Sequence, residues 1–249
     1  MVRADMAELA EQVARGLSKA SVLGGRAFIR TAVLFPSGST VVVGIEAEGG
    51  ERYRLSDFGQ GEDEAELLDI VNIYRHQAKE IADLSGLIFD SGAFLLIQAS
   101  AGQLVGATMA IANAASRALE RAMQRAEQRQ RSAAANLLVE RLRTIFPPPA
   151  VTRDAEIRGA STHPWHVDAM VDLGGGRAVF DFVTPHQTSI AFATTKFHDL
   201  ARLEQAPVRI AAVHRKASLG AFLAVVSQAA KVIEDDAPDR TYRHAAEAA

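Results

Sequence analysis

The stretch from Gln103 to Phe146 limits the possible folds of this chain most, because it has the pattern of one long helix. Its first half is rich in alanine and its second half is rich in arginine. Apolar residues recur at helical spacing near both ends, whereas the centre, Gln124 to Ser132, is polar and has little to bury. A helix that is apolar at its ends and polar at its centre indicates a solvent-crossing connector between two domains.

We therefore expect an α+β protein with two domains joined by this helix. The boundaries follow from the ends of the helical pattern and from the three prolines after it, Pro147 to Pro149. They give an N-terminal α+β domain over residues 1–102, the connecting helix over residues 103–146 and a C-terminal domain over residues 147–249. Proline favours a helix end here because it cannot continue a regular backbone hydrogen-bond pattern.

The N-terminal domain is expected to be a small antiparallel sheet with helices. Apolar residues at helical spacing predict an amphipathic helix from Ala4 to Ser18 and a second helix from about Asp63 to Leu84. Three β-branched and aromatic segments separated by turn residues predict an antiparallel meander. Its strands are Arg26 to Phe35, Thr40 to Ala47 and Glu51 to Leu55, and a hairpin follows at Leu87 to Phe89 and Ala93 to Gln98.

The C-terminal domain is predicted to run strand, strand, strand, helix, strand, helix. Two of its strands flank the run Gly174 to Gly176, which is typical of a flexible hairpin connection. Lys231 to Glu234 is expected to add an edge strand, and the charged chain from Asp235 onward to be frayed. The remaining segments are strands at Ala155–Gly159, Trp165–Leu173, Arg177–Thr184 and Val208–His214, and helices at Gln187–Glu204 and Leu219–Ala230.

Composition narrows the classes of function. The formal net charge of −3 argues against a generally basic nucleic-acid-binding protein, so such binding would need a local patch. The absence of cysteine excludes disulfides and thiolate chemistry. No secretory signal or membrane-length apolar run is visible, so we expect a soluble, cytoplasmic protein with no membrane partner.

The arginine-rich half of the long helix is the strongest functional signal. Four arginines recur every four residues, which places them along one helical stripe. We call them the arginine row: Arg117, Arg121, Arg125 and Arg129. A stripe of this kind presents roughly 18 Å of positive edge at 1.5 Å of rise per residue, suited to nucleic-acid phosphates or an acidic protein partner. The alternative is a solvated face with local Glu–Arg pairs, or a homodimer interface through Leu119, Met123, Ala126 and Ala133.

Two acids suggest a second candidate site. Asp168 and Asp181 lie on neighbouring predicted strands, so their carboxylates could face each other and hold a divalent metal, or could be two solvent-facing acids. His163 and His166 add ligand types at close spacing. Histidines that flank Pro164 and Trp165 are nevertheless more often loop and packing residues, which we favour here.

From Arg30 to Met123 the chain resembles a family known as domain of unknown function eighteen twenty-eight, which is common in prophages and other mobile elements. The resemblance rests on Phe35-Pro36, Tyr53-Arg54-Leu55-Ser56-Asp57-Phe58-Gly59 with the acidic helix after it, and Phe94-Leu95-Leu96. It implies a mobile-element context and supplies no activity.

The C-terminal part, with the end of the long helix, runs α-β-β-β-α-β and is similar to the restriction-endonuclease-like core, the PD-(D/E)xK superfamily. That resemblance implies Asp168 as the first metal-binding acid and Asp181 as the second, with Glu140 as an accessory acid. Val183 stands where the superfamily has its catalytic lysine. The resemblance then implies that Lys196, on the following helix, takes that role.

These observations leave two main hypotheses. The first is a non-catalytic protein of a phage or mobile element that binds nucleic acid or a partner, with a possible role in defence or counter-defence. The second is a nuclease that uses Asp168, Asp181 and Lys196 with Mg²⁺ or Mn²⁺. The geometry of these three side chains should distinguish them, because the nuclease requires the two carboxylates and the amine to converge.

Overall fold

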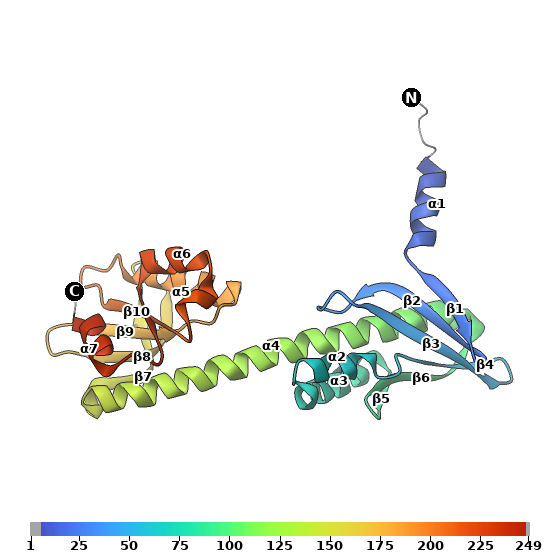
Figure 1. Cartoon of the computed structure of the whole chain (residues 1–249), viewed down its shortest axis with the longest axis horizontal. Helices are drawn as coiled ribbons and strands as arrows, with labels where there is room; N and C mark the ends of the chain where they lie inside the picture. The colour runs from blue at the N-terminus through green and yellow to red at the C-terminus, as the bar shows by residue number, and fades with distance from the viewer. Residues whose placement is uncertain (1–5, 248–249) are drawn as a thin grey trace. The chain divides into compact units, whose positions relative to one another are not determined.

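The computed structural model describes residues 6–247 and shows a mixed α+β chain with one long helix, α4 (Leu104–Ile145) (Figure 1). This coarse fold prediction is confirmed. The chain divides into two compact units, Met1–Glu127 and Gln128–Ala249, and the division falls within α4. The ends of α4 contribute to different hydrophobic cores, one in each unit.

The first unit contains a six-stranded antiparallel sheet. The meander predicted from the sequence is present as the three consecutive strands β2, β3 and β4, but it is only the middle of the sheet. Residues 19–23 form a further edge strand, β1, which sequence patterning missed because all of its side chains are exposed. The spatial order is β1 (Lys19–Leu23), β2 (Arg26–Leu34), β3 (Thr40–Gly49), β4 (Arg52–Ser56), β6 (Ala93–Ser100) and β5 (Ile88–Asp90).

The helical segments of the first unit differ from the prediction in one respect. The single helix expected over residues 63–84 is wrong, because the chain forms α2 (Gln60–Leu67) and α3 (Val71–Ser85) instead. Asp69, between them, has φ of 57°, a left-handed conformation that interrupts a helix and that aspartate tolerates better than most residues. Helix α1 (Met6–Gly16) falls within the predicted Ala4–Ser18, of which Ala4 and Asp5 lie outside the described residues.

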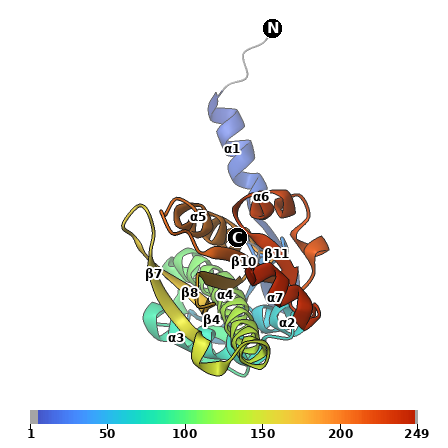
Figure 2. The ribbon, with the colours of Figure 1, turned by 90° about the vertical axis from the view of Figure 1, so that its left-hand side faces the viewer.

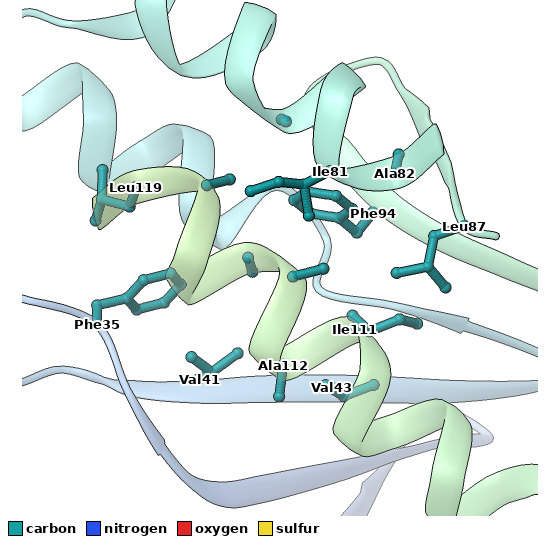
Figure 3. Packing of buried hydrophobic residues seen from close by; sticks show 14 of the residues in the cluster. Phe35, Val41, Val43, Ile81, Ala82, Leu87, Phe94, Ile111, Ala112 and Leu119 are labelled. Atoms are coloured by element: carbon teal, nitrogen blue, oxygen red, sulfur yellow. The ribbon is translucent and has the colours of Figure 1, made fainter. Parts of the chain in front are cut away.

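The core of the first unit forms where the alanine-rich half of α4 packs on the sheet. Figure 3 shows Ile111 and Ala112 of α4 close to Val41 and Val43 of strand β3, with side chains of α3 and β6 also near α4. Small alanine side chains let a helix backbone approach a sheet closely, which explains the composition of this half of α4. The buried cluster includes Phe35, Val41, Val43, Ile81, Leu87 and Phe94.

The second unit contains a five-stranded mixed sheet. In chain order, the first, second and third strands pair antiparallel. The third, fourth and fifth strands pair parallel. The predicted edge strand at Lys231–Glu234 is present. The spatial order is β11 (Lys231–Glu234), β10 (Val208–Val213), β9 (Arg177–Phe182), β8 (Pro164–Asp172) and β7 (Val151–Arg158).

Helices cover both faces of this sheet, as Figure 2 shows for the second unit. The end of α4 and α7 (Asp239–Glu247) pack on one face, and α5 (Gln187–Leu200) and α6 (Phe222–Ala229) pack on the other. The prediction of a frayed chain after Asp235 is wrong, because Tyr242 of α7 is buried and stacks on Phe180 of β9. Between residues 6 and 247 the chain also forms three short 3-10 turns, at Ala101–Gln103, Pro148–Ala150 and Lys216–Leu219.

Candidate functional site

Strands β8 and β9 separate at the position of the two candidate acids. Their main-chain pairing runs from Asp172 opposite Arg177 to Ala169 opposite Phe180 and goes no further. Beyond that point the Asp168 N–H donates to Oδ1 of Asp181 at 2.9 Å, and the Phe182 N–H donates to Oδ2 of Asp168 at 2.7 Å. Each carboxylate therefore accepts a hydrogen bond from the opposite strand, in place of the main-chain carbonyl of a regular ladder.

Lys196 joins the two acids from the buried face of α5. Its Nζ lies 2.5 Å from Oδ2 of Asp181 and donates to the main-chain oxygen of His166 on β8 at 2.5 Å. We call Asp168, Asp181 and Lys196 the acid–lysine cluster. The structure thus brings together the three residues that the sequence singled out, and Asp181 and Lys196 are only 1% and 2% exposed.

The charges in this cluster balance. Burial raises the pKa of the Asp181 carboxyl to about 6, while the nearby Lys196 ammonium lowers it and the Asp168 carboxylate raises it. A fourth residue, Arg131 of α4, places Nη2 3.2 Å from Oδ1 of Asp168. Two carboxylates and two cations give no formal net charge, so the cluster lacks the excess negative charge that concentrates divalent cations.

This donor set does not fit a divalent cation. Mg²⁺ and Mn²⁺ prefer several oxygen ligands that are free to coordinate, whereas both carboxylates here bind a cation and a main-chain N–H. Among residues 6–247, no three His, Cys, Asp or Glu side chains gather closely enough to hold a metal ion. Glu140, which the endonuclease resemblance implies as an accessory acid, is instead exposed, and its Oε1 lies 2.9 Å from Nη1 of Arg143.

Sequence reasoning did not identify Arg131 as part of this site. Arg131 lies two residues after Arg129, outside the four-residue period of the arginine row. Arg131 also lines a polar hollow of about 230 Å³ beside Asp168, together with Ser132, Ala135, Asn136, Val139, Arg153 and Asp154. The only sequence signal for its role was that break in spacing.

The two candidate histidines do not join Asp168 in a ligand set. Nδ1 of His166 lies 3.5 Å from Oδ1 of Asp154, and both side chains are exposed. His163 packs against Trp165 with the ring centroids 4.4 Å apart. These positions agree with loop and packing roles for both histidines.

The arginine row lies on α4. Arg117 and Arg125 are exposed and Arg121 is half-buried in the first unit, and Arg129 is exposed in the second unit. The spacing of four residues in a continuous helix puts the guanidinium groups on successive turns. A stripe of guanidinium groups has the geometry to contact a series of phosphates or carboxylates.

A second buried acid lies in the first unit, at the Ser56-Asp57-Phe58-Gly59 turn between β4 and α2. Oδ1 of Asp57 accepts hydrogen bonds from the Phe94 N–H at 2.7 Å and from the Gly59 N–H at 3.3 Å. Burial raises the pKa of Asp57 to about 6, although these hydrogen bonds lower it. Asp57 therefore ties the turn to strand β6, a role in the architecture of the unit.

Comparison of the chain with protein-family models, with curated proteins and with solved structures gives no match in any of the three. No helix in the described part of the chain is both long and apolar enough to cross a membrane.

Proposed function

We propose that this chain is a nucleic-acid-binding protein of a phage or mobile element that does not cleave its ligand. The observation that carries the proposal is the ion pairing of the acid–lysine cluster, in which Lys196 neutralises Asp181 and Arg131 neutralises Asp168. The α-β-β-β-α-β order of elements in the second unit supports the proposed resemblance to an endonuclease-like core. The two acids here hold two separated strands together, and we infer that the metal-binding role has been lost.

The arginine row supports the binding part of the proposal. Each arginine can donate to a phosphate in a bidentate manner, and contacts of this kind depend on charge rather than on base sequence. The formal net charge of the whole chain is −3, so the positive stripe is a local feature of α4. We expect salt-sensitive binding with little sequence preference.

The test is fluorescence anisotropy with labelled 20-nucleotide duplex and single-stranded probes in EDTA, over a range of salt concentrations. The variant replaces all four arginines of the row with glutamine. If each one contacts a phosphate, the slope of log affinity against log salt falls by about 0.9 per lost contact on duplex DNA.

A matched control separates the stripe from the total charge. Four exposed arginines elsewhere are replaced with glutamine, which removes the same charge: Arg15, Arg30, Arg240 and Arg243. The proposal expects the control to bind as the wild type does. Equal losses of affinity in the two variants would refute the arginine row as the interface. A wild-type protein that binds neither probe at low salt would refute nucleic-acid binding and direct the search to an acidic protein partner.

One observation favours a second candidate, a divalent-metal-dependent nuclease. The two carboxylates and the lysine amine converge, as that chemistry requires, although Val183 occupies the usual lysine position. Metal binding would require Arg131 to leave Asp168 and Lys196 to withdraw from Asp181. Metal-dependent cleavage by the wild type, lost on Asp181→Asn, would favour this candidate.

A further inference from the structure

Three aromatic side chains, one of them distant in sequence from the other two, gather at one end of the second unit's sheet. His163 comes from the β7–β8 turn, Trp165 from β8 and Phe192 from α5. The His163 and Trp165 ring centroids are 4.4 Å apart, those of Trp165 and Phe192 are 5.4 Å apart, and both pairs meet edge to face. We call these three residues the aromatic platform.

The platform is held in place by Asp199 of α5. Its Oδ2 accepts a hydrogen bond from Trp165 Nε1 at 2.7 Å and another from Ser161 Oγ at 2.6 Å, and its Oδ1 accepts one from the Ser161 N–H at 2.9 Å. The bonds from the Ser161 and Trp165 side chains lower the pKa of Asp199, so the carboxylate stays ionised. A Cβ on Gly159 would lie 1.9 Å from Oδ2 of Asp199, so this packing requires glycine there. The indole and the turn beside it are therefore preorganised.

One ring of the platform is buried and the other two are exposed. Trp165 is 8% exposed, whereas Phe192 is 59% exposed and His163 is also exposed. Burial of Phe192 against its own unit would have been favourable. Its exposure beside a second exposed ring leaves apolar aromatic surface available to a ligand.

Positive charge flanks the platform. Arg202 is close enough to Asp199 for its charge to lower the pKa of that carboxyl. Arg202 is exposed, so exposed aromatic surface and a cationic group occur together, as in sites that bind single-stranded nucleic acid.

We propose that the aromatic platform binds an unpaired nucleobase of a single strand, which stacks on Phe192 and His163 while Arg202 contacts a flanking phosphate. This inference rests on the proposed nucleic-acid binding and specifies its ligand as single-stranded. Bases in an intact duplex are stacked on one another and cannot enter such a site, so duplex binding is expected to be independent of the platform.

The test uses Trp165, the only tryptophan in the chain, as an internal probe. The full-length protein is titrated with 20-nucleotide oligothymidine and, separately, with a 20-base-pair duplex. Oligothymidine is expected to quench Trp165 fluorescence, because a bound base stacks on His163 and Phe192, whose rings contact the Trp165 indole. The duplex is expected to bind without this quenching.

The variant is Phe192→Leu, with Phe222→Leu on α6 as the matched control, because Phe222 is also exposed. Stacking free energies per base predict that Phe192→Leu weakens oligothymidine binding by roughly 5- to 100-fold, with duplex binding unchanged. His163→Ala is a second variant with the same expected direction, and circular dichroism verifies that each variant is folded.

The outcomes separate this inference from the function on which it rests. Equal oligothymidine affinities for Phe192→Leu and Phe222→Leu would overturn the stacking site, and retained salt-sensitive duplex binding would leave the proposed function intact. Loss of duplex and single-strand affinity to the same extent in Phe192→Leu would also overturn it. A wild type that binds no probe would refute both.

Discussion

Replacing Lys196 with methionine should destabilise the second unit severely. Methionine is similar in length and apolar, so the change removes the ammonium while filling much of the same volume. It leaves Asp181, which is 1% exposed, without its cation and the His166 main-chain oxygen without its donor. Breaking a buried ion pair from one side costs about 3–5 kcal/mol in the free energy of unfolding.

The double variant Lys196→Met/Asp181→Asn should recover part of that loss. Asparagine keeps an oxygen that can accept the Asp168 N–H, and it carries no charge to leave buried. The two substitutions share one ion pair, so their effects should not add. We expect a coupling free energy of roughly 1–3 kcal/mol.

The assay is urea unfolding of the full-length chain followed by Trp165 fluorescence. Trp165 is the sole tryptophan and lies in the second unit, so the signal reports that unit. Lys216→Met is the matched control, because Lys216 is exposed and its loss should change the unfolding free energy by less than about 0.5 kcal/mol. A Lys196→Met protein as stable as this control would refute the structural role of the cluster. If Lys196→Met does not fold, Lys196→Gln and the double variant provide the same comparison.

Three further predictions concern stability. Burial raises the pKa of Asp57 from 3.8 to about 6, so the folded state binds its proton more tightly and the first unit should lose about 2 kcal/mol of unfolding free energy as pH rises from 4 to 7. Hydrogen exchange of the Phe94 amide, corrected for intrinsic rates, should show this loss, and Asp57→Asn should abolish it. Gly61→Ala would place a Cβ 2.1 Å from the buried Tyr74 hydroxyl and should cost about 1–3 kcal/mol by circular dichroism. Tyr242→Ala should cost about 3–5 kcal/mol by Trp165 fluorescence; a loss below about 1 kcal/mol would show that α7 is not needed for the second unit.

The regular elements could be predicted wherever burial imposes a period on the sequence. The long helix was evident because apolar residues recur at helical spacing near both of its ends, and the central strands because one face of each is buried. Strand β1 has no buried face and hence no alternation. The break between α2 and α3 depends on the left-handed backbone of Asp69, which residue type alone does not specify.

The candidate site could be predicted only in part. Element order was enough to suggest that Asp168, Asp181 and Lys196 converge. The burial of Asp181 and Lys196, and the ion pair of Arg131 with Asp168, depend on where β8 and β9 separate. That point is set by how the strands pair in the folded sheet, which the sequence does not specify. The aromatic platform was missed for a similar reason, because Phe192 is 27 residues from Trp165 along the chain and meets it only through packing.

The most direct test of the central claim is a cleavage assay in Mg²⁺ and in Mn²⁺, with plasmid, linear and single-stranded DNA as substrates. Wild-type protein and Asp181→Asn are compared, with Trp165 fluorescence verifying that both are folded. Because both carboxylates are neutralised by cations, we expect no metal-dependent cleavage by either protein, together with salt-sensitive binding that persists in EDTA. Cleavage by the wild type that disappears in a folded Asp181→Asn protein would contradict this account and establish a nuclease in which Lys196 has replaced the missing strand lysine.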